Sequence, residues 1–483
     1  MGVSDIIDLI DRDNEVYTAV DLISIAKELG SDKHRDPLRL IIDTADCLHR
    51  LYGGYYNDWI CGGQWCSAYK FIENFCRTCN KTGIDLIAII HGCGYPKHQV
   101  EWYHIESSRR MKSSRLVKQL KFKGVIPDKN KWVAPMPLTM CLRLAFRCQT
   151  ELHRCRLFTT IDDHCVEVLQ YFKRKNAYGL LAHKSDYLLL GAPMLFDSVA
   201  LLLARKFTHL NSRQVSMESF YSRLGLPAGR IPLLATLLGN HLLTGDFLSD
   251  FHHGMLGDES TYKFASPLER FTKLLKGVIQ FITALPEDLH LEDIAKTAFG
   301  KNYSTEMFSK FQSSYHYFER HQFSKRVKHE SNEEINSTVV LAPIGSQLQC
   351  SDRDSSIQRE SDTPSTSNNV DDALNTGYDD AKDTSSDSLL LNSTDQQLNG
   401  EPLCSAQIIK VIKERHKNGL MCPEIAHIMF QRQIWLCSGI EDECNNELPA
   451  NSFVFREARS YIYGMLLDIS HSTSAGNLVL CLI

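Results

Sequence analysis

The stretch Leu38–Trp65, LRLIIDTADCLHRLYGGYYNDWICGGQW, decides the fold. It begins with an apolar run that is typical of a buried strand and that ends at Asp43. Ionised carboxylates avoid dry interiors, and in open α/β sheets ligands and metals bind at the carboxyl ends of strands. Residues 44–52 are expected to continue as a helix. The sequence therefore predicts an α/β fold in which Asp43 lies at the rim of a parallel sheet, just before a helix.

Several motifs follow in a recognisable order. The chain opens Met1-Gly2-Val3, passes through a helical segment and reaches the strand that ends at Asp43. This order resembles the N-terminal half of the flap-endonuclease (XPG-type, PIN-like) nucleases. The finer match, IDTADCLHRLYGGYYNDWICGGQW, resembles the family of the constitutive coactivator of peroxisome proliferator-activated receptor gamma. The resemblance covers Met1 to about Lys325, resumes over Cys404–Leu467, and implies a PIN-like domain whose central, mostly parallel sheet is flanked by helices.

Composition and charge divide the chain. Ser351–Pro402 carries twelve acidic and three basic residues, so its net charge is −9, whereas the rest is about +4 within a total of −5. This segment holds one aromatic residue and cannot bury enough apolar area to offset the entropy of ordering. We therefore expect four parts: a nuclease-like domain at 1–325, a disordered acidic linker at 326–402, a small C-terminal α+β module at 403–470 and a tail at 471–483.

Other elements are expected from periodicity. Ile84–Ile90 is a second buried strand that precedes His91, and Tyr178–Ala182 is another that precedes Lys184. Apolar residues at helical spacing fall within 5–29, 66–79, 138–151, 231–243 and 270–299. No apolar run is long enough to span a membrane, so no membrane insertion is expected. Sixteen scattered cysteines indicate a reducing compartment, here the nucleus or the cytoplasm.

The resemblance supplies positions at which a metal centre can be tested. Two-metal phosphodiester cleavage requires several carboxylates around two Mg²⁺ ions roughly 4 Å apart, because Mg²⁺ prefers oxygen ligands. The positions that the resemblance assigns to metal ligands hold, in chain order, Asp43, His91, the pair Asp162 and Asp163, Lys184 and Asp186, and then His241 or its neighbour Asn240.

These substitutions argue against nuclease chemistry. An ammonium at Lys184 repels Mg²⁺ and can pair with Asp43 or Asp186 instead. The alternative to catalysis is that Asp43 and Asp186 act as helix N-caps or salt-bridge partners. We therefore expect no catalytic residues, a vestigial acidic site and no cofactor. A single weakly held Mg²⁺ stays open.

A basic segment follows the second strand. Arg109–Lys131 holds nine basic residues and one acid, Asp128. In the related nucleases this region contacts single-stranded nucleic acid, and clustered Lys and Arg can neutralise phosphates. A solvated helical face is the alternative. The candidate nucleic-acid-binding residues are Arg109, Arg110, Lys112, Arg115, Lys118, Lys121 and Lys123.

Two further patterns are weaker. Cys61, Cys66, Cys76 and Cys79 could suggest zinc, but the last two lie in an expected helix among apolar residues. Leu234-Ala235-Thr236-Leu237-Leu238 matches the LxxLL pattern by which helices dock into grooves of nuclear receptors, although these leucines are expected to face the core.

Together these features predict a nuclease-like protein without nuclease chemistry. The resemblance implies transcriptional coactivation, RNA binding or scaffolding, with RNA or single-stranded nucleic acid and proteins such as nuclear receptors or signalling proteins as partners. The alternative is an active Mg²⁺-dependent, structure-specific 5′ nuclease.

Overall fold

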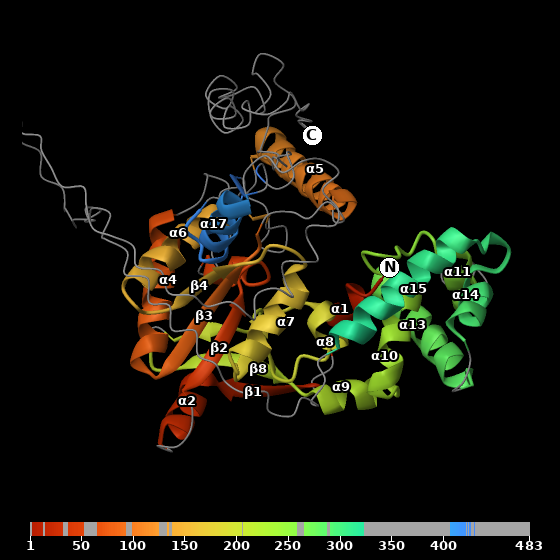
Figure 1. Cartoon of the computed structure of the whole chain (residues 1–483), viewed down its shortest axis with the longest axis horizontal. Helices are drawn as coiled ribbons and strands as arrows, with labels where there is room; N and C mark the ends of the chain where they lie inside the picture. The colour runs from red at the N-terminus through yellow and green to blue at the C-terminus, as the bar shows by residue number, and fades with distance from the viewer. Residues whose placement is uncertain are drawn as a thin grey trace, which may run out of the picture. The chain divides into compact units, whose positions relative to one another are not determined.

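The fold is described from a computed structural model (Figure 1). It describes residues 2–12, 15–31, 37–52, 65–92, 99–124, 133–134, 138–204, 206–257, 265–286, 290–322, 406–421, 423, 425–426 and 429. The expected linker and tail, and most of the expected C-terminal module, lie outside these residues.

One mixed sheet organises the described chain. The strands are β1 (Tyr17–Asp21), β2 (Leu38–Asp43), β3 (Ile84–Ile90), β4 (Arg156–Thr159), β5 (Gly179–Ala182), β6 (Leu195–Asp197), β7 (Leu202–Leu203) and β8 (Leu210–Val215). Their order is β1-β8-β6-β5-β2-β3-β4, with β7 paired to β8. The run from β6 to β4 is parallel, and β8 is antiparallel to its neighbours. Since β2 pairs with β3 on one side and with β5 on the other, its carboxyl end lies at the point where the chain reverses strand order, the usual ligand position of such sheets.

The helices cover both faces of this sheet. They are α1 (Asp5–Ile10), α2 (Leu22–Ser31), α3 (Leu48–Leu51), α4 (Trp65–Lys81), α5 (Gln99–Lys123), α6 (Leu138–Glu151), α7 (His164–Arg174), α8 (Ser185–Leu189), α9 (Met217–Leu224), α10 (Ile231–Leu238), α11 (Ser249–Leu256), α13 (Pro267–Ala284), α14 (Leu291–Phe299), α15 (Thr305–His321) and α17 (Ala406–Lys417). Among these described helices, none is both long and apolar enough to cross a bilayer.

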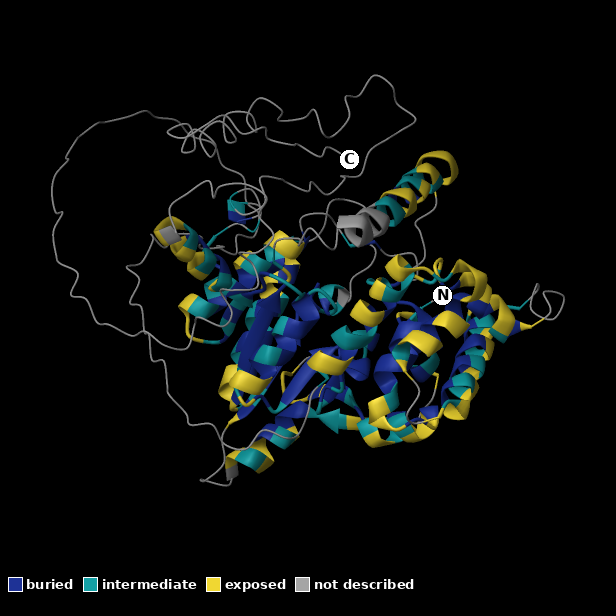
Figure 2. Cartoon of the chain, turned by 45° about the vertical axis from the view of Figure 1, so that its right-hand side comes forward, coloured by how far each residue is buried: buried dark blue, intermediate teal, exposed yellow. Residues whose placement is uncertain are grey.

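Two apolar cores follow from the alternation of side chains along the strands. Leu40 and Ile42 of β2 belong to a core that includes residues of α2, α4 and α6, whereas Ile41 belongs to a second core that includes residues of α7, α8 and the helices from α9 to α15. Figure 2 shows the central strands as buried. Because Asp43 shares the parity of Ile41, its side chain points to the face that carries α7 and α8.

The expected fold class, an α/β fold with a central, mostly parallel sheet and flanking helices, is confirmed. The strands at Leu38–Asp43 and Ile84–Ile90 lie where the sequence placed them. Three expectations were wrong. The 5–29 segment is interrupted by β1, the helix expected over 44–52 is limited to α3, and the one expected over 231–243 ends at Leu238.

The chain divides into two compact units. One comprises Met1–Ser324 together with Gly400–Ile483, and the other comprises Lys325–Asn399. All described residues belong to the first unit, so β4 and α17 are parts of one unit. The four-part division expected from the sequence stays a prediction.

Candidate functional site

Asp43 is buried at the end of β2, and both of its carboxylate oxygens have partners. Oδ1 lies 2.9 Å from His164 Nε2 and accepts the Ala45 amide at 3.0 Å. Oδ2 accepts the Tyr187 hydroxyl at 2.6 Å. Burial disfavours the charged form, but His164 and Tyr187 outweigh it and hold the pKa of Asp43 below its usual range. Asp43 is therefore an ionised carboxylate enclosed by protein donors.

His164 supplies the positive charge beside Asp43. It begins α7, and its Nδ1 lies 3.0 Å from the Thr160 hydroxyl. That hydroxyl donates to the carbonyl of Ile90, so it is available to accept a proton from Nδ1. Nε2 faces a carboxylate, which only accepts. Burial opposes the charge on His164, yet the adjacent Asp43 carboxylate raises its pKa, so the contact between Nε2 and Asp43 is that of an ion pair.

The other assigned positions surround this pair. The His91 ring packs on the His164 ring, with centroids 4.9 Å apart. Lys184 Nζ lies 3.7 Å from Asp186 Oδ2 and 3.1 Å from the sulfur of Cys165. Because the Lys184 side chain is 41% exposed, this ion pair contributes little to stability, typically about 0–1 kcal/mol.

Asp163 serves α7 instead of pointing into an open site. Its Oδ1 accepts the Val166 amide at 3.0 Å as the helix N-cap, and its Oδ2 accepts the Tyr317 hydroxyl at 3.0 Å. The ring of His241 meets that of Tyr317 edge to face, with centroids 4.9 Å apart. The preceding residue, Asn240, is buried and donates to Ser314 at 2.7 Å. These contacts tie the α10–α11 turn to α15. Asp162 precedes the α7 N-cap and has interactions of its own.

These residues do not fit a two-metal centre. Mg²⁺ coordination needs several carboxylate oxygens that converge on one point. Asp43 and Asp163 instead accept hydrogen bonds on both of their oxygens, and the cationic side chains of His164 and Lys184 lie beside the acidic groups. Asp46 is close by, and burial together with the Asp43 charge raises its pKa to about 7. Its Oδ2 is buried and has no hydrogen-bond partner among the described residues, but one such oxygen does not make the set of converging carboxylates that two Mg²⁺ ions need.

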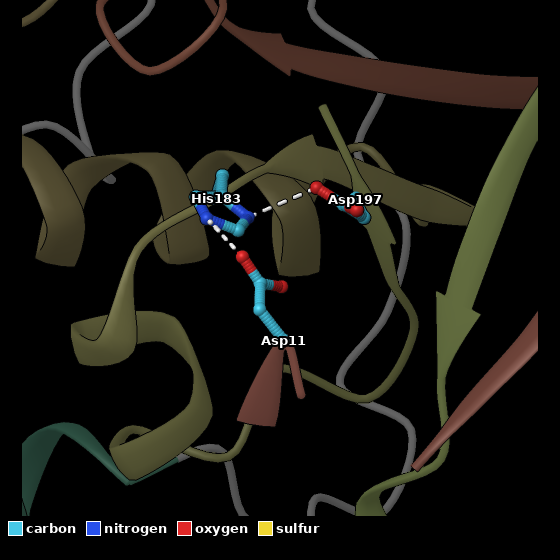
Figure 3. A group of neighbouring side chains, drawn as sticks. All are labelled: Asp11, His183 and Asp197. Atoms are coloured by element: carbon cyan, nitrogen blue, oxygen red, sulfur yellow. Dashed lines mark hydrogen bonds and ion pairs between the residues drawn. The ribbon is translucent and has the colours of Figure 1, made fainter. Parts of the chain in front are cut away.

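One group of side chains has the spacing of a metal site. Asp11, His183 and Asp197 bring ligand atoms within 4.8 Å of one another (Figure 3). His183 Nδ1 lies 2.9 Å from Asp197 and its Nε2 lies 3.3 Å from Asp11. Burial opposes the charge, but the two carboxylates raise the pKa of His183 to about 9. Arg213 binds both carboxylates as well, with its Nε 2.9 Å from Asp197.

The four side chains of this network are balanced in charge. Two carboxylates face one imidazolium and one guanidinium, and the Tyr17 hydroxyl donates to Asp11 at 2.9 Å. Both nitrogens of His183 face carboxylates, and the ion pairs among these side chains account for the arrangement without a metal ion. The network is a partly buried ion-pair cluster that joins the end of α1 to β6 and β8.

Helix α5 carries the candidate nucleic-acid-binding residues. From residue 107 to 123, where its side chains are described, the helix holds seven bases and no acid. Ser113 and Leu116 are buried, and Arg109 donates to the carbonyl of Ala134 at 3.1 Å, so one side of the helix faces the protein. The exposed bases of the helix are Arg110, Lys112, Arg115, Lys118, Lys121 and Lys123.

The weaker sequence patterns are accounted for by packing. Leu234, Leu237 and Leu238 of the LxxLL pattern are fully buried, which confirms that they face the core. Cys76 and Cys79 are buried free thiols of α4, Cys66 is exposed, and Cys61 lies outside the described residues. Among the described cysteines and other ligand-type side chains, none besides Asp11, His183 and Asp197 forms a metal-like group.

Several site residues escaped the sequence reasoning. His164, Tyr187 and the His183 network were missed because the positions tested were those where the related nucleases carry acids. A usable signal for His164 exists, since it opens a helix directly after a strand and an Asp N-cap. In a parallel sheet this position lies beside the carboxyl end of the neighbouring strands.

The similarity to known proteins covers most of the chain. A FAM120A-like domain model matches residues 224–322. The human constitutive coactivator of PPAR-gamma-like protein 2 is 25% identical over 90% of this chain and 51% of its own length. The bovine constitutive coactivator of PPAR-gamma-like protein 1 is 31% identical over 62% of this chain and 28% of its own length. The chain thus spans about half the length of the first of these curated relatives and less of the second.

Solved structures are similar at a lower level. The catalytic core of Rad2 in complex with DNA substrate is 12% identical, with a TM-score of 0.34, over 64% of this chain and 99% of that chain. The eukaryotic junction-resolving enzyme GEN-1 is 13% identical, with a TM-score of 0.32, over 64% of this chain and 68% of that chain. The expected resemblance is confirmed by the sequence relatives: the chain is similar, over most of its length, to the constitutive coactivators of PPAR-gamma-like type.

Proposed function

We propose that this protein is a nuclease-like scaffold without nuclease chemistry that acts in transcriptional coactivation and binds RNA or single-stranded nucleic acid. The absence of nuclease chemistry is proposed from the contacts of the Asp43 carboxylate. Its two oxygens contact His164, Tyr187 and a backbone amide, so protein groups take most of the lone-pair positions that a metal ion would need. The loss of metal binding removes the groups that would activate water and stabilise the leaving oxygen.

Charge supports the same conclusion. Two dications normally offset the negative charge of a carboxylate cluster. Here His164 and Lys184 provide positive charge beside Asp43 and Asp186. The acidic site is therefore neutralised by the chain itself. Neither a cofactor nor a bound Mg²⁺ is needed to stabilise the fold around it.

A cleavage assay tests the proposal. Purified protein with Mg²⁺ or Mn²⁺ is expected to leave flap, bubble and single-stranded substrates intact. Asp43→Asn is the matched variant, because it keeps the size of the side chain and removes its charge. Cleavage by the wild type that disappears in Asp43→Asn would overturn the proposal. Cleavage that persists in Asp43→Asn would indicate a contaminating nuclease.

The exposed face of α5 supports the nucleic-acid role. Met111, Arg115, Lys118 and Phe122 follow each other at intervals of four, three and four residues, so they form one stripe along the helix. At a rise of about 1.5 Å per residue the stripe is about 16 Å long. Met111 is 56% exposed and Phe122 71%. Basic side chains that neutralise phosphates, together with an exposed aromatic ring on which a base can stack, are typical of surfaces that bind unpaired strands.

Charge reversal at exposed bases of α5 tests the proposed binding of nucleic acid. Arg115→Glu, Lys118→Glu and Lys121→Glu together are expected to weaken binding of a labelled single-stranded oligonucleotide strongly. The salt slope should also become shallower by roughly 0.7 for each phosphate that the protein no longer neutralises. The control is Lys27→Glu, Lys81→Glu and Lys276→Glu, which makes the same change in net charge at exposed positions elsewhere. Equal affinities of the two triple variants would remove α5 from the interface.

The coactivator role rests on the names of the sequence relatives and requires a protein partner, such as a nuclear receptor or a signalling protein. The burial of Leu234, Leu237 and Leu238 places such a contact outside the LxxLL pattern of α10. A nuclear or cytoplasmic location belongs to the same proposal. Pull-down of the full chain with and without RNase separates partners held by protein contacts from those held through RNA.

A further inference from the structure

Helix α17, which follows the linker segment, lies against the edge strand β4 (Figure 1). Its anchor is His416, which is fully buried and whose Nε2 lies 2.9 Å from the carbonyl oxygen of Thr160, just beyond the end of β4. A buried hydrogen bond between residues so far apart in the chain requires that the surface around Thr160 fit the His416 side chain.

The surface that receives α17 is shaped for it. A Cβ at Gly92 would lie 1.6 Å from the Thr160 carbonyl oxygen and 2.8 Å from His416 Nε2. Only glycine therefore allows β3, β4 and His416 to approach this closely. Gly419, at φ +65°, sits on Leu157, since a Cβ there would be 2.8 Å from Leu157 Cδ2. The guanidinium of Arg143 on α6 donates to the carbonyl of Met421.

The surface that binds α17 adjoins the cluster of Asp43, His164 and Tyr187. Thr160 binds His416 through its carbonyl oxygen and contacts His164 through its hydroxyl. The Gly92 amide donates to that same hydroxyl at 3.1 Å. His416 therefore lies beyond the carboxyl ends of β3 and β4, on the side of the sheet where open α/β folds place their ligands.

The contact is narrow. Ile408 and Val411 of α17 are 44% and 49% exposed, and burial is concentrated in Ile412, His416 and Gly419. A few residues on one face of α17 make the buried contacts, as in complexes in which a helical peptide binds in a groove.

We propose that Gly92, Arg143, Leu157 and Thr160 form a helix-docking site, and that α17 is its intramolecular ligand. The chain thereby fills part of its own ligand position at the carboxyl edge of the sheet. The site recognises a helix by a histidine on its inner face, followed three residues later by glycine in the left-handed conformation. This inference does not depend on nucleic-acid binding by α5.

Cleavage of the covalent connection tests the proposal. A specific protease site is placed between residues 360 and 370 of the full chain, the chain is cut, and size-exclusion chromatography shows whether the two pieces stay together. We expect them to co-elute in the wild type. Loss of the buried His416 hydrogen bond in His416→Ala, and the clash with Leu157 in Gly419→Val, should each weaken association by about tenfold or more. Lys410→Ala, on the exposed side of α17, is the matched control and should behave as the wild type.

A second measurement guards against loss of folding in the variants. A peptide of residues 403–421 added in excess to the cut wild-type protein should displace the C-terminal piece, and the same peptide with His416→Ala should not. Separation of the wild-type pieces without peptide would overturn the proposal. Co-elution that survives both His416→Ala and Gly419→Val, or that both peptides leave unchanged, would assign the association to other residues and overturn it equally.

Discussion

At the residue scale, the decisive feature is that protein donors and a histidine surround the buried carboxylate of Asp43. Asp43 was identified from the sequence because an ionised carboxylate is costly to bury, so an acid at the end of an apolar strand indicates that its charge has a partner. Its partners His164 and Tyr187 could not be predicted in the same way. They come from two other segments, and only the sheet order brings them to the end of β2.

The pairing of His164 with Asp43 predicts a strong coupling in stability. His164→Leu keeps the volume but leaves a buried carboxylate without its cation, which should cost about 3–5 kcal/mol. Adding Asp43→Asn removes the stranded charge, so the double variant should be more stable than the sum of the single changes by more than about 1 kcal/mol. Urea unfolding of the four proteins measures this coupling. His253→Leu, at an exposed position of α11, is the control. Additive effects would show that the two side chains do not form a structural pair.

The His183 network predicts a loss of stability at alkaline pH. The pKa of His183 is about 9 in the folded protein and 6.5 without its partners, so its contribution is fully present below pH 6.5 and is lost as the pH rises through 9. The difference corresponds to at most about 3 kcal/mol. The lowered pKa values of Asp11 and Asp197 work in the opposite sense, because their contribution is lost as the pH falls below the ordinary value of 3.8.

His183→Asn isolates this effect. The free energy of unfolding of the wild type should fall more steeply than that of the variant between pH 6.5 and pH 9. The two curves should converge at the alkaline end, apart from a constant offset that reflects packing. Parallel curves over the whole range would contradict the assignment of a protonated His183.

At the element scale, the sequence identified the strands with long apolar runs and missed those that are short or polar. Strands β2 and β3 are continuous apolar runs because parallel strands are covered on both faces. Strands β1 and β8 carry Thr, Asp, Asn, Ser, Arg and Gln, and β6 has only three residues, so none of them has an apolar period. Helix α15 was missed because only three of its residues are buried, at Phe311, Ser314 and Phe318, and one of them is a serine.

Helix α5 was identified from its charge, but its orientation could not be predicted from the sequence. Its basic residues were evident from the sequence, whereas the side on which Met111 and Phe122 lie could be assigned only once Ser113 and Leu116 were known to be buried. Phe122→Ala should weaken single-strand binding by about 1–3 kcal/mol through loss of base stacking. The salt slope should stay unchanged because no charge is removed.

Anisotropy titrations at two salt concentrations provide the measurement. Leu144→Ala, another exposed apolar side chain but on α6, is the matched control. If Phe122→Ala and Leu144→Ala bind as tightly as the wild type, contacts to phosphates alone account for the affinity.

At the scale of the whole molecule, the sheet carries three groups of charged and polar side chains near the carboxyl ends of its parallel strands. The Asp43 cluster lies at the end of β2, the His183 network follows β5 and β6, and His416 of α17 binds beyond β4. Each closes part of an edge that an enzyme of this architecture would leave open for substrate. The sequence could indicate the missing carboxylates, but the groups that replace them belong to segments far apart in the chain.

Calorimetric titration of the full chain with Mn²⁺ tests the central claim most directly. A side-chain cluster that already contains its own cations should not bind a second set. The wild type is therefore expected to show no saturable Mn²⁺ binding tighter than about 1 mM, an affinity equivalent to −4.1 kcal/mol. Asp43→Ala should give the same trace. Binding of one or two Mn²⁺ ions in the wild type that is lost in Asp43→Ala would contradict the account.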